Sequence, residues 1–223
     1  MTRTKLMDRQ MPVYSRNEEK FNMITHIVGG GIAVAALVLC VIRSALHHSG
    51  VGIGCSIVFG VSMILLYTMS SIYHGLPDGK GKRVMQVLDH CSVYILIAGS
   101  YTPVLLCGIA REEPVAAWIL FGIVWGLAIF AIVLNSIDLR SFRHLSMVLY
   151  LLMGWTIVVR LPALIRTMGR TGFLLILAGG ILYTIGAALY NMGRKTPYMH
   201  SVFHIFVVAG SICHILAILL YAV

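Results

Sequence analysis

Long apolar stretches alternate with short polar connections along this chain of 223 residues. Each stretch is long enough, at about 18 residues or more, to cross roughly 30 Å of hydrocarbon as an α-helix. They cover residues 24–44, 51–74, 86–108, 115–134, 144–161, 172–190 and 200–222. We therefore predict an all-α integral membrane protein, in which a bundle of seven transmembrane helices (residues 24–223) follows an N-terminal segment of residues 1–23.

Composition agrees with this class of protein. Hydrophobic residues make up 59% of the chain and charged residues 11%, and the mean hydropathy is +0.90. A soluble globular domain of this length is far less apolar. The connections, such as residues 75–83, hold turn formers and charges and leave no room for a soluble domain. Glycines at 29–31 and 179–180 predict places where neighbouring helices approach closely.

The distribution of Lys and Arg predicts the orientation in the membrane. With the N-terminus in the cytoplasm, 12 of the 17 Lys and Arg residues fall on the cytoplasmic side. Positive residues near span ends are retained on that side, so we predict the N-terminus inside and the C-terminus outside. The formal charge of +9 then reflects topology and anionic headgroups. Basic clusters with interleaved aromatic residues are lacking in the sequence, so membrane lipids are the expected partners and nucleic acid is not.

Two histidines, His200 and His204, stand four residues apart where the last apolar stretch begins. On an α-helix this spacing turns by about 40° and rises about 6 Å, so both rings lie on one face and can share a metal ion. His74 ends the second stretch and, on the predicted topology, lies at the same depth. Three neutral imidazoles with one open position are the ligand set of a catalytic zinc site, where the metal lowers the pKa of water to about 7. We therefore predict zinc as the cofactor.

Two further residues near this depth are candidates for the chemistry. Asp89 begins the third stretch on the same side, and ionisable groups at one membrane depth indicate a shared polar site. We expect it to hold or deprotonate the water. Ser70 lies one turn before His74 and could orient a ligand or the water, or bond a carbonyl one turn back. The alternative for the histidines themselves is an interfacial position, bonded to backbone or headgroups.

His26, near the start of the first stretch, is at the right depth to line the same pocket. Asn22 and Glu19 are its possible partners. His214 lies roughly 15 Å deeper than His204, which is too far for the same ion.

The remaining polar residues near the pocket have less specific interpretations. His90 neighbours Asp89 but points about 100° away around the helix, which argues against both serving one metal. Tyr73 and Tyr101 are interpreted as interface or packing aromatics.

The order of these residues resembles the bacterial hemolysin III family, within the superfamily that includes the adiponectin and progestin receptors and, more distantly, the alkaline ceramidases. The matching pieces span nearly the whole chain: Glu18-Glu19, Asn22, Thr25-His26, residues 70–74, 88–90, 98–103 and 200–208. The resemblance implies a seven-helix protein of the bacterial inner membrane with a cytoplasmic N-terminus and zinc held by His74, His200 and His204. It also implies a water in contact with Asp89, with Ser70 close by. Ser201 departs from the acidic residue expected in many bacterial members.

Three functions fit these observations. The first is zinc-dependent, ceramidase-like hydrolysis of lipid amide bonds in membrane lipid homeostasis, in which Asp89 assists attack on a carbonyl that the metal polarises. The second is a non-enzymatic receptor or regulator of lipid state with structural zinc. The third is a pore-forming, cytolytic hemolysin or an ion transporter, although continuous apolar spans suit a resident membrane protein better than a soluble toxin. The sequence names neither the substrate nor the oligomeric state.

Overall fold

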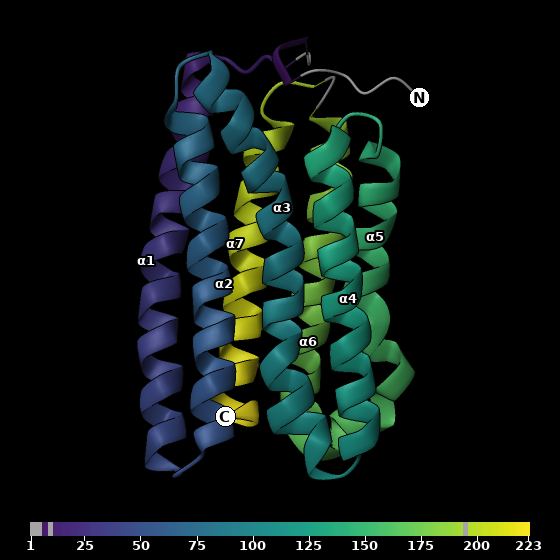
Figure 1. Cartoon of the computed structure of the whole chain (residues 1–223). Helices are drawn as coiled ribbons and strands as arrows, with labels where there is room; N and C mark the ends of the chain where they lie inside the picture. The colour runs from purple at the N-terminus through teal and green to yellow at the C-terminus, as the bar shows by residue number, and fades with distance from the viewer. Residues whose placement is uncertain (1–5, 9–10, 194–195) are drawn as a thin grey trace.

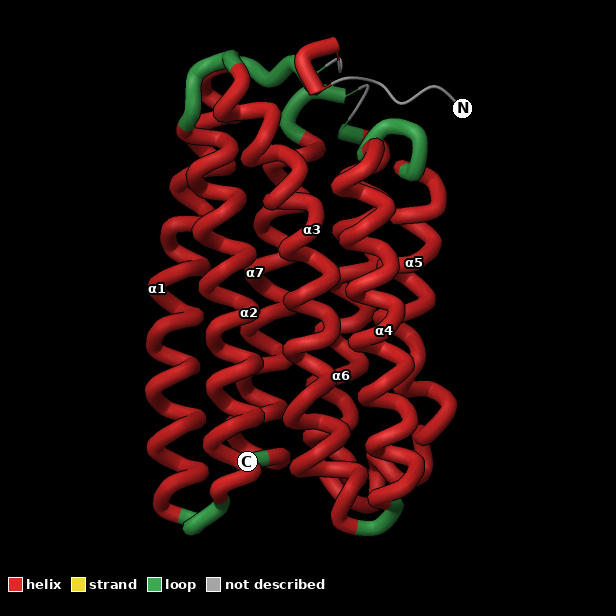
Figure 2. Tube along the Cα trace, viewed as in Figure 1, coloured by secondary structure: helices red, strands yellow, loops and turns green. Residues whose placement is uncertain are grey.

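The protein is a bundle of long helices that run along a common axis (Figures 1 and 2). The computed structural model describes residues 6–8, 11–193 and 196–223, and this part of the chain contains no strand. The α-helices are α1 (Arg16–Leu46), α2 (Gly50–Gly75), α3 (Lys80–Pro103), α4 (Pro114–Asp138), α5 (Arg143–Trp155), α6 (Leu161–Met192) and α7 (Met199–Ala217). Short 3-10 or π-helical turns are η1 (Leu6–Asp8), η2 (Val104–Gly108), η3 (Ile109–Arg111), η4 (Thr156–Arg160) and η5 (Ile218–Ala222). The predicted all-α class is confirmed.

The helices have the length and composition of membrane spans. Six helical segments of the described chain are long and apolar enough to cross a bilayer. Their outer surfaces expose large apolar side chains, for example Ile27, Val34 and Val38 on α1. A contiguous apolar exterior of this kind fits contact with lipid, where the backbone polar groups are satisfied inside each helix.

One of the six segments, residues 143–192, covers two of the predicted spans, and it folds back on itself at Gly169. Gly169 has φ 69° and ψ 173°, a conformation essentially restricted to glycine. Trp155 Nε1 donates to Thr184 Oγ1 at 3.1 Å, so residues on either side of Gly169 lie against each other. This turn favours the count of seven spans, which stays a prediction.

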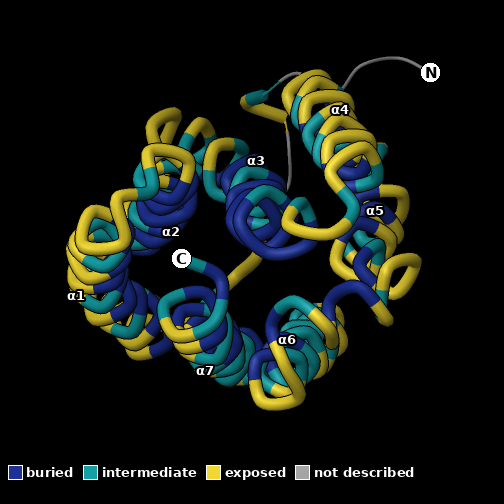
Figure 3. The backbone as a smooth tube through the Cα atoms, turned by 90° about the horizontal axis from the view of Figure 1, so that it is seen from below, coloured by how far each residue is buried: buried dark blue, intermediate teal, exposed yellow. Residues whose placement is uncertain are grey.

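The helix α3 occupies the inner position of the bundle. In the membrane-spanning segment that contains α3, 67% of an apolar stretch of 18 residues is buried inside the protein. In each of the other five segments, half or less of the corresponding stretch is buried. Figure 3 shows α3 closer to the centre of the bundle than its neighbours α2 and α4. Close packing between the other helices uses glycine: a Cβ on Gly29 of α1 would lie 2.6 Å from Tyr67 Cε1 of α2, and one on Gly179 of α6 would overlap the ring of His214 of α7. Gly31 and Gly180, by contrast, face open space.

The helix α1 begins before the predicted span 24–44. A capping box starts it at Ser15, whose hydroxyl accepts from the Glu18 N–H while the Glu18 carboxylate accepts from the Ser15 N–H at 2.9 Å. Glu19 and Asn22 therefore belong to the first turns of α1. At the far end of this helix Arg43 Nε donates to the Val223 carbonyl at 2.8 Å, so the start of α1 and the end of the chain lie at opposite ends of the bundle (Figure 1).

Candidate metal centre

Three histidines meet at the end of the bundle where α1 begins. His74 lies in the last turn of α2, and His200 and His204 lie in the first turns of α7. His200 Nε2 is 3.4 Å from His74 Nε2 and 3.2 Å from His204 Nε2. All three side chains are buried, and their ligand atoms lie within 4.8 Å of one another. We call these three residues the histidine group.

The histidine group has the spacing of a tetrahedral metal site. Zinc–nitrogen bonds of 2.0–2.1 Å at tetrahedral angles place two ligand nitrogens about 3.3 Å apart, which matches the 3.2 and 3.4 Å separations. A neutral imidazole carries one N–H, and its other nitrogen has a lone pair. Three Nε2 atoms that face one another cannot all be paired by hydrogen bonds among themselves, but their lone pairs can bind one metal ion. The histidine group could therefore bind a metal ion.

A hydrogen bond to Glu19 holds His74 in the orientation that a metal ligand needs. His74 Nδ1 donates to Glu19 Oε2 at 2.6 Å, which leaves the Nε2 lone pair free to face the other two rings. The second Glu19 oxygen accepts from Lys82 Nζ at 2.7 Å, and the ammonium group also donates to the carbonyl of Leu76 at 3.0 Å. A carboxylate behind a ligating histidine raises its basicity and fixes its tautomer.

The role of Glu19 differs from the one suggested by the sequence. We expected it near His26, whereas its carboxylate contacts His74. The signal was present in the spacing, because Glu19, Asn22 and His26 stand three and four residues apart and so share one face of α1. That face packs against the ends of α2 and α7, where the histidine group lies.

His26 and Asn22 lie directly behind His204. The His26 ring stacks on the His204 ring with centroids 3.8 Å apart, and it meets the Tyr67 ring edge-on at 5.1 Å. Both side chains are buried, and within the described residues neither the His26 nitrogens nor the Asn22 amide has a hydrogen-bond partner. His26 is outside the histidine group but lines the cavity beside it.

Asp89 and Ser70 lie together at the same cavity. Both residues line the cavity along with His200 and His204. Asp89 is not one of the three grouped ligands. The structure thus places Asp89 and Ser70 in the same cavity as His200 and His204. The candidate metal ligands are the three histidines alone.

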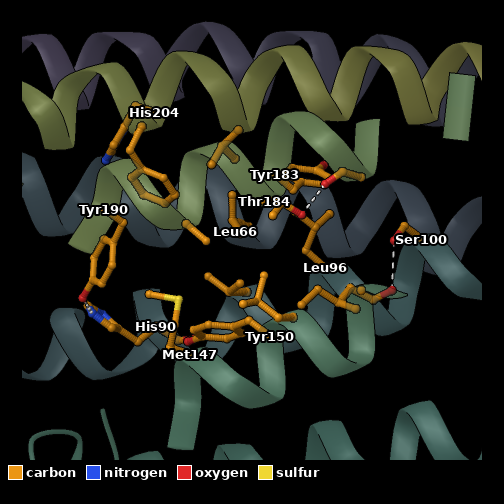
Figure 4. Close-up of a pocket in the computed structure, with 18 of the residues that line it drawn as sticks. Leu66, His90, Leu96, Ser100, Met147, Tyr150, Tyr183, Thr184, Tyr190 and His204 are labelled. Atoms are coloured by element: carbon orange, nitrogen blue, oxygen red, sulfur yellow. Dashed lines mark hydrogen bonds between the residues drawn. The ribbon is translucent and has the colours of Figure 1, made fainter. Parts of the chain in front are cut away.

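His90 is not a member of the histidine group, although it lines the same cavity. Its Nδ1 donates to the Gln86 carbonyl at 2.8 Å, and its Nε2 accepts from the Tyr190 hydroxyl at 3.0 Å. Figure 4 shows this pair at one end of the cavity, near His204. Tyr190 had no assigned role in the sequence, where nothing distinguishes it from other tyrosines in apolar stretches.

The two tyrosines interpreted as packing residues have different surroundings. The Tyr73 ring lies 4.6 Å from the His74 ring and 5.3 Å from Lys82 Nζ, so it borders the histidine group. Tyr101 lies elsewhere: its hydroxyl donates to the Gly154 carbonyl at 2.8 Å and accepts from the Ile157 N–H at 2.9 Å. It joins α3 to the end of α5.

A largely apolar cavity leads away from the histidine group into the bundle. It has a volume of about 160 Å³ and runs between side chains of α2, α3, α5, α6 and α7. Figure 4 shows His204 and Tyr190 at one end, Leu66, Leu96 and Met147 along the walls, and Ser100 toward the other end. A second cavity of about 200 Å³ adjoins it, since the two share the lining residues Ser100, Tyr101, Gly154, Trp155, Gly180 and His214. His214 is hydrogen-bonded to the Ile176 carbonyl at 3.3 Å, far along this path.

These features define a class: a helical, multi-pass membrane protein with a buried histidine group that could hold a metal ion. Comparison with known proteins places the chain in the haemolysin-III related family, whose model matches residues 14–215. The chain is 38% identical over 204 residues to Hemolysin-3 of Bacillus cereus, covering 92% of this chain and 91% of the relative.

Further relatives extend the comparison. A Hemolysin-3 homolog of Bacillus subtilis (strain 168) is 36% identical over 211 residues, which cover 95% of this chain and 97% of the relative. The human monocyte to macrophage differentiation factor is 25% identical over 173 residues, covering 74% of this chain and 68% of the relative. This distant similarity fits the wider superfamily that the sequence indicated. No solved structure matches the chain.

Proposed function

We propose that this protein is a zinc-dependent hydrolase of lipid amide bonds that acts within the membrane. One observation carries the proposal: His200 and His204 open, together with Asp89 and Ser70, onto a cavity with largely apolar walls. An amide group at the polar end and an acyl chain along the walls would satisfy both parts of this cavity.

The histidine group is the proposed zinc site. Three imidazoles are the protein ligands of a typical catalytic zinc, whose fourth position stays open for water or substrate. When bound, the ion would polarise the substrate carbonyl and lower the pKa of water. Glu19 holds His74 in the orientation that such a site needs.

Asp89 is the proposed general base and acid. Hydrolysis joins a water oxygen to the carbonyl carbon and breaks the carbon–nitrogen bond, while a proton must pass from the water to the leaving nitrogen. Asp89 takes that proton and returns it to the nitrogen, so that a fatty acid and an amine are released. Ser70 lines the same cavity and would orient the carboxylate during both transfers.

Entry from the membrane explains the depth of the site. All three members of the histidine group are buried, and the cavity that reaches His200 and His204 is bordered by Val93, Leu96 and Ile97 of α3 and by Leu151 of α5. A lipid could enter sideways between helices without its acyl chain passing through water. An apolar path of this kind disfavours small polar substrates.

The test is hydrolysis of N-acyl lipids by zinc-loaded, detergent-purified protein, with release of labelled fatty acid as the readout. We expect His204→Ala and Asp89→Ala each to lower turnover about 100-fold or more, because one removes a ligand and the other the proton carrier. Asp89→Ala should retain zinc, whereas His204→Ala should lose it. The control is His144→Ala, since His144 is exposed at the same end of the bundle. Equal turnover by Asp89→Ala and the parent would contradict the proposal.

A separate observation favours a second candidate, a lipid-state receptor with structural zinc. The histidine group joins the end of α2 to the start of α7, and the Glu19–Lys82 ion pair extends the contact to α1 and α3. A metal there would tie four helices together. In the same experiment this candidate is supported if zinc removal lowers the Tm of the parent while no lipid releases fatty acid.

A further inference from the structure

The three members of the histidine group are held in place by different means. His74 has a charged partner in Glu19. The His204 ring is covered by the His26 ring at 3.8 Å. His200 has no charged partner of this kind, and its buried Nδ1 has no hydrogen-bond partner in the part of the chain that the structure describes. With no hydrogen bond at Nδ1, the side chains packed around the His200 ring must orient it.

Aromatic rings surround His200. The Tyr14 ring stacks on it, with centroids 4.7 Å apart and planes 19° from parallel. Phe203 and Tyr190 meet it at 5.4 and 5.7 Å with more tilted planes. Tyr14 also lies 5.8 Å from the His74 ring. Its ring is therefore the most nearly parallel of the three to His200, and it also borders His74.

The chain around Tyr14 is anchored beside α7. Ser15 and Glu18 form the capping box that starts α1 immediately after Tyr14. Glu18 Oε1 accepts from the backbone N–H of Tyr198 at 2.7 Å, close to His200 at the start of α7. These bonds hold the start of α1, next to Tyr14, beside the start of α7, where His200 lies.

The Tyr14 side chain is half-buried, and its ring meets the His200 imidazole face to face. A neutral aromatic face contributes packing and a π-surface to the imidazole, worth about 0.5–1.5 kcal/mol in typical aromatic pairs.

We propose that Tyr14 is a positioning residue for His200: its ring holds the imidazole so that Nε2 faces the other two members of the histidine group. The inference rests on the proposed metal site, and it gives a function to the segment before the first membrane helix. Partners behind a metal ligand typically change metal affinity by 10–100-fold when removed. Here the partner is an aromatic face in place of a carboxylate.

The experiment measures zinc affinity by competition with a chromophoric chelator, using detergent-purified protein at fixed pH. We expect Tyr14→Ala and Tyr14→Leu to weaken zinc binding about 10-fold or more, because neither supplies an aromatic face. Tyr14→Phe keeps the face and should bind within about twofold of the parent, since the effect depends on the ring. Val13→Ala is the matched control, because Val13 is the preceding residue and its side chain is 97% exposed.

The outcomes separate this inference from the proposed function. A folded parent that binds no zinc overturns the metal site and the role of Tyr14 with it. A parent that binds zinc, with Tyr14→Leu binding equally well, overturns only the role of Tyr14. If Tyr14→Ala fails to fold, the comparison of Tyr14→Leu with Tyr14→Phe still decides, since both retain bulk and only one retains a ring.

Discussion

At the scale of single residues, the centre depends on a carboxylate that belongs to another helix. Glu19 on α1 bonds both His74 on α2 and Lys82 on α3. The Glu19 side chain is 19% exposed and that of Lys82 is 6% exposed, so the pair is partly shielded from water. Removing the charge of Glu19 therefore affects both His74 and a buried ammonium group.

Glu19→Gln should lower zinc affinity about 10-fold or more, because an amide is a weaker acceptor for His74 Nδ1–H and no longer raises the basicity of Nε2. Chelator competition measures the affinity. The double variant Glu19→Gln with Lys82→Met serves as control: it removes the uncompensated ammonium charge and should recover thermal stability but not zinc affinity. Unchanged zinc affinity in Glu19→Gln would show that His74 needs no charged partner.

The sequence predicted the histidine group better than its supports. The pairing of His200 with His204 follows from their spacing on one helix. The place of His74 at the same depth follows from its position at the end of an apolar stretch. Glu19 and Tyr14 act across helices, and no spacing along one segment shows which distant ring a side chain will meet. Tyr14 also lies in the polar segment before the first span, where an apolar pattern gives no information about packing.

At the scale of elements, one glycine turns the chain between two predicted spans. The apolar pattern ends one stretch at residue 161 and begins the next at 172, whereas helical structure continues to Met168 and resumes after Gly169. Arg166 pairs with Glu112 at 2.7 Å and with Glu113 at 3.1 Å, which holds this turn against the connection between α3 and α4. A loop of polar turn residues is unnecessary because glycine alone adopts the required conformation.

Gly169→Ala should destabilise the protein by about 1–3 kcal/mol, because a Cβ makes this backbone conformation strained. Thermal unfolding in detergent measures the effect as a lower Tm. Gly122→Ala is the control, since Gly122 lies within α4 with open space around its Cα and its helical backbone accepts alanine. A Tm of Gly169→Ala equal to that of Gly122→Ala would show that the turn tolerates another conformation.

The start of α1 is a second feature that the apolar pattern does not predict. The predicted first span begins at residue 24, but α1 begins at Arg16 because the Ser15–Glu18 capping box starts a helix in polar sequence. The extra turns carry Glu19 and Asn22 to the histidine group. Class and approximate spans follow from hydropathy, whereas the turns that build the site follow from local hydrogen bonds that hydropathy ignores.

At the scale of the whole molecule, the site lies at one end of the bundle and the cavity leads from it toward the other. The start of α1, the end of α2 and the start of α7 share the end that carries the histidine group (Figure 1). Which compartment faces this end depends on the orientation of the bundle. The charge distribution predicts the cytoplasm, because Lys and Arg concentrate in the connections at this end.

Labelling of single cysteines tests this orientation. In a variant without the five native cysteines, we introduce His47→Cys in the connection between α1 and α2, or Asp78→Cys in the connection between α2 and α3; both positions are exposed. A membrane-impermeant thiol reagent added to intact bacterial spheroplasts should label His47→Cys and should reach Asp78→Cys only after permeabilisation, because positive residues hold the second connection inside. The cysteine-free parent gives the background. The reverse pattern would place the histidine group on the outer side.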